Sequence, residues 1–446
     1  FKGAVFYAKV FSAYIFQVLK EGYNIAVYIE GTRSRSGKLL QPQLGMLSIL
    51  LHAFFEGACK DMIFVPVFIA YDRIPDEGSY LHEISGGKKS AESFRQMLKA
   101  KRILKDRYGK VHLNFGRPLG LNDMLAEQGL TGAVLSAKQQ NSLCRDIGDQ
   151  MMNAINRQTV VTPQSLVAGA LLSGGREIIS RKELTFRIEA SMNQFYAQGS
   201  CLADTLADGH QSAVEIALYH FRGRKFIQWV DAKAKDQVRH NAWRIVENRR
   251  NALDYYKNIS ICHFIPPAFT ALAILEKDAF QLSSADLHVT YRRLQDLFCE
   301  EFIPDPNHPP AYTVRKTVKA FIDNAILVPH PVMPDTYNIS SEGYRKLVFF
   351  AGYIEPFLES YRTALVYFAK NRRNHHHKAK MLKKMLAIGN RMIRQGEIRL
   401  KESISKANYN NAIGFYAKNG VRGSEDEEMV RHWNDTLVHF QNLISR

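Results

Sequence analysis

The chain has 446 residues, of which 46% are hydrophobic, and it carries a formal net charge of +17. This composition excludes an intrinsically disordered chain, and the length is sufficient for two or three domains with substantial cores. The positive charge predicts an anionic partner but does not distinguish among nucleic acid, anionic lipid and phosphorylated substrates.

Cysteine spacing and apolar runs restrict the class of protein further. The five cysteines are widely spaced and form no CxxC pair, which indicates buried, reduced thiols and implies no metal site. No signal peptide and no apolar run of membrane-spanning length is evident. The most apolar long stretch, residues 259–275, is broken by Pro266 and Pro267, and we interpret it as a core helix or as a segment that dips partly into a membrane. Because the chain starts with Phe1 and not Met, we interpret it as part of a longer protein.

The amino-terminal stretch contains two predicted helices and one predicted strand. Apolar residues at spacings of three and four predict an amphipathic helix over residues 4–21, closed by Gly22. Residues 24–30 have the composition and length of a buried strand. A second helix is predicted over residues 44–55.

The following segments favour an α/β domain. Residues 62–70 form an almost purely apolar run, which is typical of a parallel strand buried on both faces, and Pro66 within it indicates an edge or a bulge next to a site. A helix is predicted over residues 90–107 and a strand over residues 110–115. This alternation predicts a mostly parallel sheet with flanking helices over residues 1–121.

A basic turn follows the first predicted strand and is the strongest candidate site. Gly31 ends the strand, because glycine takes backbone conformations that a β-carbon forbids. Arg33 and Arg35 then alternate with small hydroxyl residues, so both guanidinium groups would face one phosphate as donor forks. Thr32, Ser34 and nearby backbone N–H groups would add neutral donors. The alternative is a solvated basic turn, which is the commoner fate of neighbouring arginines.

The rest of the chain is predicted to be largely helical, with a helical region over residues 122–250 and a helical carboxy-terminal domain over residues 251–446. Two segments begin alike: a capping box of Ser180 and Glu183 is predicted to start one helix, and Ser283 opens another in a similar way. Each leads through helix to a short strand-like piece, at residues 226–230 and 325–328. This pattern indicates a weak repeat. A winged-helix interpretation of it would favour a nucleic-acid-binding protein.

The most basic stretch, residues 370–406, carries twelve Lys or Arg against two Glu, a balance of +10. A helical stripe of apolar side chains runs through it: Met381, Met385, Ile388 and Met392. The stretch is either a solvated helix face packed by this stripe or a surface for anionic phospholipid headgroups. The tract from His375 to His377 is interpreted as solvated and not as a metal site.

Four segments together resemble the glycerol-3-phosphate acyltransferases of the large bacterial and mitochondrial type. They are EGTRSRSGK, LLQPQLGMLS, IFVPVFIAYDR and GKVHLNFGRPL, which start at Glu30, Leu39, Ile63 and Gly109. Members of that family carry four blocks in order: an HxxxxD pair, paired arginines, E-G-[GT]-R-S-R and V-P-[IV]. The third block matches Glu30 to Arg35 and the fourth Val65 to Val67. Dihydroxyacetone-phosphate acyltransferases share these blocks. The resemblance continues weakly through the segment from Tyr255 to Asn258 and the helix after it.

The first two blocks are expected upstream of the turn and do not occur there, so we predict that this chain lacks the catalytic His and Asp and has no turnover alone. Its one HxxxxD, from His330 to Asp335, lies far downstream and is interpreted as a chance match.

The resemblance implies transfer of a fatty acyl group from an acyl thioester, carried by coenzyme A or acyl carrier protein, to the sn-1 hydroxyl of glycerol 3-phosphate. A histidine would act as general base, with no covalent intermediate, cofactor or metal. It also implies a peripheral protein on the cytoplasmic face of a membrane. The implied partners are glycerol 3-phosphate, the acyl thioester and an anionic membrane surface, and not nucleic acid. The implied substrate-binding residues are Glu30, Gly31, Thr32, Arg33, Ser34, Arg35, Lys38 and Pro66. Among them, Arg33 and Arg35 would hold the phosphate, Glu30 would orient an arginine or the acceptor hydroxyls, and Pro66 would shape a wall or the acyl tunnel.

Overall fold

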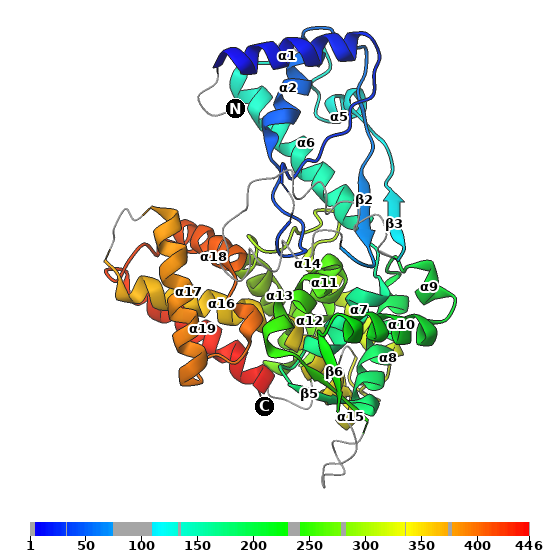
Figure 1. Ribbon diagram of the computed structural model, residues 1–446, viewed down its shortest axis with the longest axis vertical. Helices are drawn as coiled ribbons and strands as arrows, with labels where there is room; N and C mark the ends of the chain where they lie inside the picture. The colour runs from blue at the N-terminus through cyan, green and yellow to red at the C-terminus, as the bar shows by residue number, and fades with distance from the viewer. Residues whose placement is uncertain are drawn as a thin grey trace. The chain divides into compact units, whose positions relative to one another are not determined.

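The computed structural model describes residues 5–32, 34–74, 109–132, 135–230, 241–277, 282–334, 336–372 and 377–445 (Figure 1). Its contacts divide the chain into two units. The smaller unit contains Phe1–Ser34, Leu39–Ala70 and His112–Thr159, and the larger contains Arg35–Lys38, Tyr71–Val111 and Val160–Arg446. These limits differ from the expected divisions after residues 121 and 250. The basic turn is shared between the two units, since Ser34 belongs to one and Arg35 to the other.

Helices form most of the ordered structure of the smaller unit. Helix α1 (Val5–Lys20) and helix α2 (Leu44–Phe55) confirm the two predicted amino-terminal helices. Gly22 follows α1 with a φ of +80°, as expected for a glycine that ends a helix. Helices α5 (Leu121–Glu127) and α6 (Ala137–Arg157) complete the set, and their apolar faces bury a common core with α1 and α2.

The predicted buried strand over residues 24–30 is wrong. These residues form no strand, and Val27 and Tyr28 are 41% and 85% exposed. The run has the composition of a strand, but a strand also needs a hydrogen-bonded neighbour. The backbone hydrogen bonds found here are instead isolated ones: the Gly31 N–H donates to the Tyr28 carbonyl at 2.9 Å, and the Gln43 N–H donates to the Ile29 carbonyl at 2.8 Å.

The predicted parallel sheet is also not observed, because the described strands pair in small antiparallel sheets. Strand β1 (Ile63–Phe64) pairs with β4 (Leu119–Gly120) in antiparallel fashion. Strand β2 (Val67–Tyr71) pairs with β3 (Val111–Phe115), and hydrogen bonds from Gly116 to Pro66 and from Asp72 to Lys110 give this pair an antiparallel register. The apolar run is therefore split at Pro66, which supplies no N–H for a ladder. The helix predicted over residues 90–107 lies outside the described residues.

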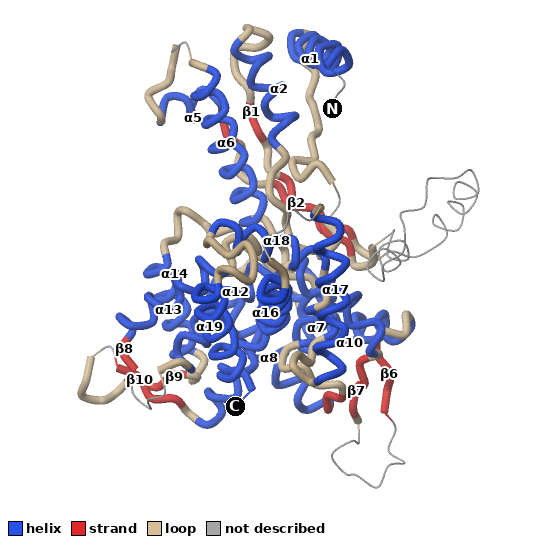
Figure 2. Tube along the Cα trace, turned by 90° about the vertical axis from the view of Figure 1, so that its left-hand side faces the viewer, coloured by secondary structure: helices blue, strands red, loops and turns tan. Residues whose placement is uncertain are grey.

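The larger unit contains two copies of one arrangement of elements, which confirms the predicted repeat (Figure 2). The first copy runs through α7 (Pro163–Leu172), β5 (Ile178–Ser180), α8 (Arg181–Gln198), α9 (Asp204–Ala207), α10 (His210–Gly223), β6 (Ile227–Val230) and β7 (Ala242–Ile245). The second runs through α12 (Ile261–Leu275), β8 (Leu282–Ser283), α13 (Ser284–Leu297), α14 (Pro310–Asp323), β9 (Leu327–Pro329) and β10 (Thr336–Ile339). In each copy the last strand lies between the other two, in the orders β5-β7-β6 and β8-β10-β9. This is the topology of a winged helix.

Local signals explain why these elements start where they do. Ser180 caps α8, and its hydroxyl accepts a hydrogen bond from the Glu183 N–H at 3.1 Å. The reciprocal half of the predicted capping box is not made, because the Glu183 carboxylate instead pairs with Arg187 and Arg345 at 2.9 Å each. The prediction of a helix start at Ser180 was therefore right, although Glu183 forms ion pairs and does not complete the capping box.

The remaining helices complete the larger unit around its core. They are η2 (Glu247–Arg249), α11 (Arg250–Ile259), α15 (Ser341–Ala351), η3 (Gly352–Ile354), α16 (Glu355–Lys370), α17 (Lys378–Gln395), η4 (Lys401–Ser403), α18 (Lys406–Lys418) and α19 (Glu427–Ser445). Helix α12 is almost wholly buried despite Pro266 and Pro267, which confirms that its apolar run is a core helix. Within the described residues, no single helix has both the length and the apolar character of a membrane span. The segments 247–259 and 261–275 reach them only together, across a bend of 92°.

The cysteine prediction is met in part. All five cysteines carry free thiols, but only Cys144 is buried and Cys299 is exposed. Burial raises the pKa of the Cys144 thiol, so this residue is a poor nucleophile.

Candidate functional site

The first half of the basic turn lies in the smaller unit and is held by its own backbone. Gly31 has a φ of +65°, and a β-carbon there would lie 2.8 Å from the Gln43 side chain, so only glycine fits. The half-buried Glu30 carboxylate accepts a hydrogen bond from the Leu40 N–H at 3.0 Å, across the base of the turn. Burial raises the pKa of this carboxyl group, and the Leu40 hydrogen bond opposes the shift. Thr32 is exposed, and Arg33 lies outside the described residues.

The second half of the turn, Arg35–Lys38, belongs to the larger unit. Ser34 and Arg35 are partly exposed, which leaves them accessible to a ligand. Ser36 and Lys38 are buried, with 8% and 4% of their surfaces exposed. Partly exposed and buried residues therefore alternate from Arg35 to Lys38. The Lys38 side chain points into the protein and not toward the solvent.

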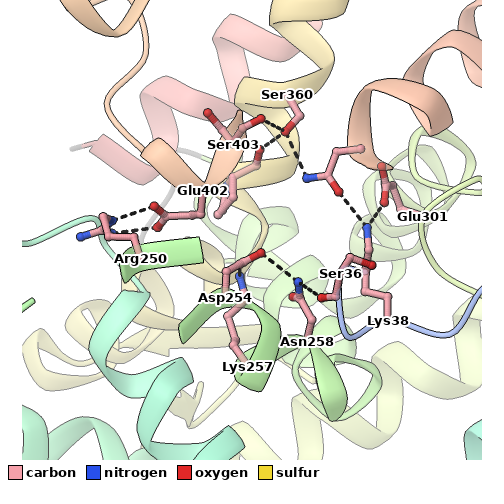
Figure 3. Close-up of polar contacts among 12 residues, drawn as sticks. Ser36, Lys38, Arg250, Asp254, Lys257, Asn258, Glu301, Ser360, Glu402 and Ser403 are labelled. Atoms are coloured by element: carbon pink, nitrogen blue, oxygen red, sulfur yellow. Dashed lines mark hydrogen bonds and ion pairs between the residues drawn. The ribbon is translucent and has the colours of Figure 1, made fainter. Parts of the chain in front are cut away.

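Lys38 is buried against a carboxylate (Figure 3). Its ammonium group pairs with Glu301, whose side chain is completely buried, and it also donates a hydrogen bond to Asn408 Oδ1 at 3.1 Å. The ring of Phe357 lies 4.5 Å from the same ammonium group and adds a cation–π contact. Burial raises the pKa of the Glu301 carboxyl group, although Lys38 opposes the shift. The structure thus places Lys38 in the interior, whereas the sequence predicted a substrate-binding position.

The backbone between Arg35 and Lys38 packs directly on helix α11. Asn258 Nδ2 donates a hydrogen bond to the Ser36 carbonyl at 2.9 Å and another to Asp254 Oδ2 at 2.9 Å. Gly37 has a φ of +82°, and a β-carbon there would lie 2.3 Å from the Tyr255 carbonyl oxygen. Such a contact is impossible, so Gly37 is required where the turn meets the helix.

Pro66 is buried at the break between β1 and β2, in the smaller unit. Its carbonyl accepts a hydrogen bond from the Gly116 N–H at 2.7 Å, and a β-carbon on Gly116 would lie 3.2 Å from the proline ring. This is a close structural contact between two chain segments, and the partner of Pro66 in it is Gly116 and not a residue of the basic turn.

Sequence reasoning missed Glu301, Asn408 and Asn258, the residues that hold the turn. Lys38 and Glu301 are 263 residues apart, and Lys38 and Asn408 are 370 apart, so no local pattern connects them. The only signal was the segment Tyr255 to Asn258, which the family resemblance touches and which includes the contact to Ser36.

Two protein families match different parts of the chain. Residues 80–425 match a family described as the glycerol-3-phosphate acyltransferase C-terminal region, and residues 5–70 match a family described as acyltransferase. The chain belongs to the glycerol-3-phosphate acyltransferase family. The family match thus extends over both winged-helix copies and over the helices that contact the turn.

Several named acyltransferases are similar to this chain. A dihydroxyacetone phosphate acyltransferase from Oryctolagus cuniculus is 26% identical over 94% of this chain and 63% of its own length. A glycerol-3-phosphate acyltransferase from Pseudomonas putida KT2440 is 29% identical over 66% of this chain and 36% of its own length. One from Xylella fastidiosa M12 is 36% identical over 42% of this chain and 22% of its own length. The chain spans less than two thirds of the length of each of these relatives.

His330, the first residue of the downstream HxxxxD, has a local structural role. His330 follows β9, and its Nδ1 accepts hydrogen bonds from the N–H groups of Val332 and Met333 at 3.2 and 3.0 Å. This ring nitrogen organises the turn between β9 and β10. Asp335 lies outside the described residues.

Proposed function

We propose that this chain takes part in the transfer of a fatty acyl group from an acyl thioester to the sn-1 hydroxyl of glycerol 3-phosphate. The observation that carries the proposal is the family match over residues 80–425, together with the anchored turn that presents Arg35. Arg33 and Arg35 hold the phosphate through bidentate hydrogen bonds, and this places the acceptor hydroxyl for attack on the thioester carbonyl.

The proton of the acceptor hydroxyl goes to the histidine of an HxxxxD block, which we infer this chain does not supply. His330 is a poor candidate, because one ring nitrogen already accepts two backbone hydrogen bonds. The attacking oxygen forms the new ester bond, the thioester C–S bond breaks, and the coenzyme or carrier leaves as a thiolate that takes up the proton. The donor is acyl coenzyme A or acyl carrier protein, and no metal or other cofactor is required.

The acceptor is glycerol 3-phosphate in preference to dihydroxyacetone phosphate. Relatives of both names match the chain, but those named glycerol-3-phosphate acyltransferase reach the higher identities. Both acceptors carry the same phosphate, so the arginines alone do not discriminate between them, and the preference must come from contacts to the second carbon.

Calorimetric titration of the purified chain with glycerol 3-phosphate, dihydroxyacetone phosphate and glycerol tests this proposal. We expect glycerol 3-phosphate to bind, glycerol not to bind, and Arg35→Ala to weaken binding by about 10- to 150-fold, which corresponds to the loss of a charged hydrogen bond of about 1.5–3 kcal/mol. Arg181→Ala is the control, since Arg181 is 62% exposed and pairs with Glu215 away from the turn. Unchanged affinity of Arg35→Ala for glycerol 3-phosphate would rule out Arg35 as a ligand of the phosphate.

The chain alone is expected to show no acyl transfer. The measurement is incorporation of labelled glycerol 3-phosphate into lipid in the presence of acyl coenzyme A or acyl carrier protein. Turnover by residues 1–446 would contradict the proposed location of the base, and His330→Ala would then show whether His330 supplies it.

We also propose that the protein is peripheral on the cytoplasmic face of a membrane and contacts anionic lipid through α17. This helix buries Met385 and Met392 and exposes Lys378, Lys380 and Lys383. The apolar stripe thus packs inward, and the cations are left for the solvent or for headgroups. Each cation near an anionic surface contributes about 1 kcal/mol to binding.

Nucleic-acid binding is the second candidate function, favoured by the two winged-helix copies. In helix-turn-helix proteins the second helix of the pair reads the major groove. The matching helix of the second copy, α14, exposes Arg315, Lys316 and Lys319, whereas α10 of the first exposes Ile216 and Tyr219. A duplex-binding titration at 50 and 200 mM salt distinguishes the two functions, because specific phosphate contacts produce a steep salt dependence. We expect no such dependence.

A further inference from the structure

The helical unit of this chain has no role in the mechanism described above, yet it encloses half of the basic turn. Segment Arg35–Lys38 is separated in sequence from every other part of the larger unit, and its contacts nevertheless assign it there. Arg35 is the one proposed phosphate ligand among these four residues. The contacts of its neighbours therefore decide where its guanidinium group lies.

Three contacts hold the segment, and they come from different helices (Figure 3). Lys38 pairs with Glu301, which follows α13, and donates to Asn408 on α18 at 3.1 Å. Asn258 on α11 donates to the Ser36 carbonyl at 2.9 Å. Because these contacts fix a side chain, a backbone carbonyl and, through Gly37, a close backbone approach, the segment is left with little freedom to rotate.

The partners of Lys38 are themselves fixed by further hydrogen bonds. Asn411 Nδ2 donates to the same Glu301 oxygen at 3.0 Å. Asn408 Nδ2 donates to Ser360 Oγ at 3.2 Å, and Ser360 in turn donates to the Ser403 carbonyl at 2.6 Å. A buried network in which successive members are fixed in this way holds one geometry better than an isolated pair.

We propose that Lys38, Glu301, Asn408 and Asn258 are positioning residues for the acceptor site, and that the helical unit serves to hold Arg35 in the geometry that binds the acceptor phosphate. This inference rests on the proposed function. It assigns to the long helical region a contribution to acceptor affinity, made without any contact between these four residues and the substrate.

A second buried ion pair in the same unit provides a matched control. Arg250 forms two hydrogen bonds to Glu402, at 2.7 and 2.8 Å, and both side chains are as deeply buried as those of Lys38 and Glu301. The hydrogen bonds described for these two side chains join them to each other and not to the segment Arg35–Lys38. Removing one partner of either pair leaves a buried charge without compensation and lowers stability. We expect only a substitution in the Lys38–Glu301 pair to alter the conformation of the turn as well.

The experiment compares Lys38→Met with Arg250→Met in the full chain of 446 residues, under conditions where circular dichroism shows both variants to be folded. The first measurement is the Kd for glycerol 3-phosphate by calorimetry. We expect Lys38→Met to raise this Kd at least tenfold and Arg250→Met to leave it within twofold. The second is amide hydrogen exchange of peptides that cover residues 30–42, which we expect to accelerate in Lys38→Met only.

The double variant Lys38→Met/Glu301→Met keeps the inference testable if Lys38→Met does not fold. It removes both charges, so it should regain much of the lost stability, but an apolar contact does not reproduce the directed contacts of the ammonium group. We expect its Kd to stay raised and its turn exchange to stay fast. Equal effects of the Lys38 and Arg250 substitutions on the turn, or no effect of either Lys38 variant, would overturn the inference. Failure of the proposed function would appear differently, as absence of glycerol 3-phosphate binding to the unsubstituted chain, and hydrogen exchange would then still decide whether Lys38 holds the turn.

Discussion

Gly37 shows how much a single residue contributes to the docking of the basic turn. Its left-handed backbone disfavours any other residue by about 1–2 kcal/mol, and a β-carbon would also overlap the Tyr255 carbonyl oxygen at 2.3 Å. Gly37→Ala should therefore destabilise the protein by more than the backbone term alone, and the measurement is the free energy of unfolding in urea.

Gly420 offers the matched control for this substitution. It has a φ of +80°, and nothing lies within 4 Å of its potential β-carbon, so Gly420→Ala should cost only the backbone term. We expect Gly37→Ala to be the more destabilising by at least about 1 kcal/mol, because overpacking typically costs about 1–3 kcal/mol. Equal losses would mean that the turn moves away from α11 at no cost.

The buried carboxyl group of Glu359 should make the free energy of unfolding depend on pH. Its two carboxylate oxygens accept hydrogen bonds from the Arg399 and Leu400 N–H groups at 2.8 and 3.0 Å. Burial raises the pKa of this carboxyl group to about 8, with a further contribution from Glu355, while the two N–H groups lower it. A carboxyl group whose pKa is raised on folding stabilises the protein fully below its unfolded pKa, and this contribution is lost as the pH rises through the folded pKa.

The free energy of unfolding should consequently fall between pH 5 and pH 9, by on the order of a few kcal/mol. Glu359→Gln should have a smaller slope over the same range, although it should be less stable at pH 5, since the amide nitrogen cannot accept from a backbone N–H. Urea unfolding at several pH values measures both quantities. An identical slope in Glu359→Gln would assign the pH dependence to other groups.

At the scale of elements, the sequence predicted the parts that depend on local information. The helices α1 and α2 follow from apolar spacing and from the glycines that end them, and the start of α8 follows from Ser180. The strand predicted over residues 24–30 was wrong because strand composition does not specify a pairing partner. The partners of a strand are set by tertiary structure. The anchoring of Lys38 could not be predicted for the same reason, since its partners lie hundreds of residues away.

The pair of strands β2 and β3 presents an apolar face to the solvent. The hydrogen bonds at its two ends place Ile69 opposite Leu113, and Ile69, Leu113 and Phe115 are 44%, 52% and 61% exposed. Cross-strand neighbours point to the same side of a sheet, so these side chains form one patch. Patches of this kind bind apolar probes and promote association.

The fluorescent probe 8-anilinonaphthalene-1-sulfonate should therefore bind the protein, and Leu113→Thr should lower its fluorescence. The substitution introduces a β-branched residue, which strands favour, at an exposed position and should change the free energy of unfolding by less than about 0.5 kcal/mol. Val332→Thr, at an isolated residue that is 82% exposed, is the control and should leave the fluorescence unchanged. Equal fluorescence in all three proteins would show that the probe binds elsewhere.

For the whole molecule, the net charge of +17 predicts attraction to anionic surfaces, and the proposed contact through α17 makes the prediction specific. Replacing Lys378, Lys380 and Lys383 by glutamine should weaken sedimentation with vesicles of anionic phospholipid by about 100-fold at low salt, at about 1 kcal/mol per cation. Binding should also weaken as salt is added.

The matched control for this experiment replaces three cations on another helix. Arg315, Lys316 and Lys319 are exposed on α14, so glutamine at these positions changes the net charge by the same amount. If both triple variants lose vesicle binding equally, total charge and not α17 governs the interaction. If only the α17 variant loses it, that helix is the contact surface.

The enclosure of Lys38 also has a consequence for protein synthesis. Lys38 leaves the ribosome 370 residues before Asn408, an interval of roughly 20–70 s at ordinary rates of translation. Throughout that interval the ammonium group of Lys38, which is buried in the folded protein, remains in water, because Asn408 has not yet been made. The segment Arg35–Lys38 therefore cannot reach its packed position before Asn408 has been made, and a chain that ends before Asn408 lacks one of the hydrogen bonds that hold Lys38.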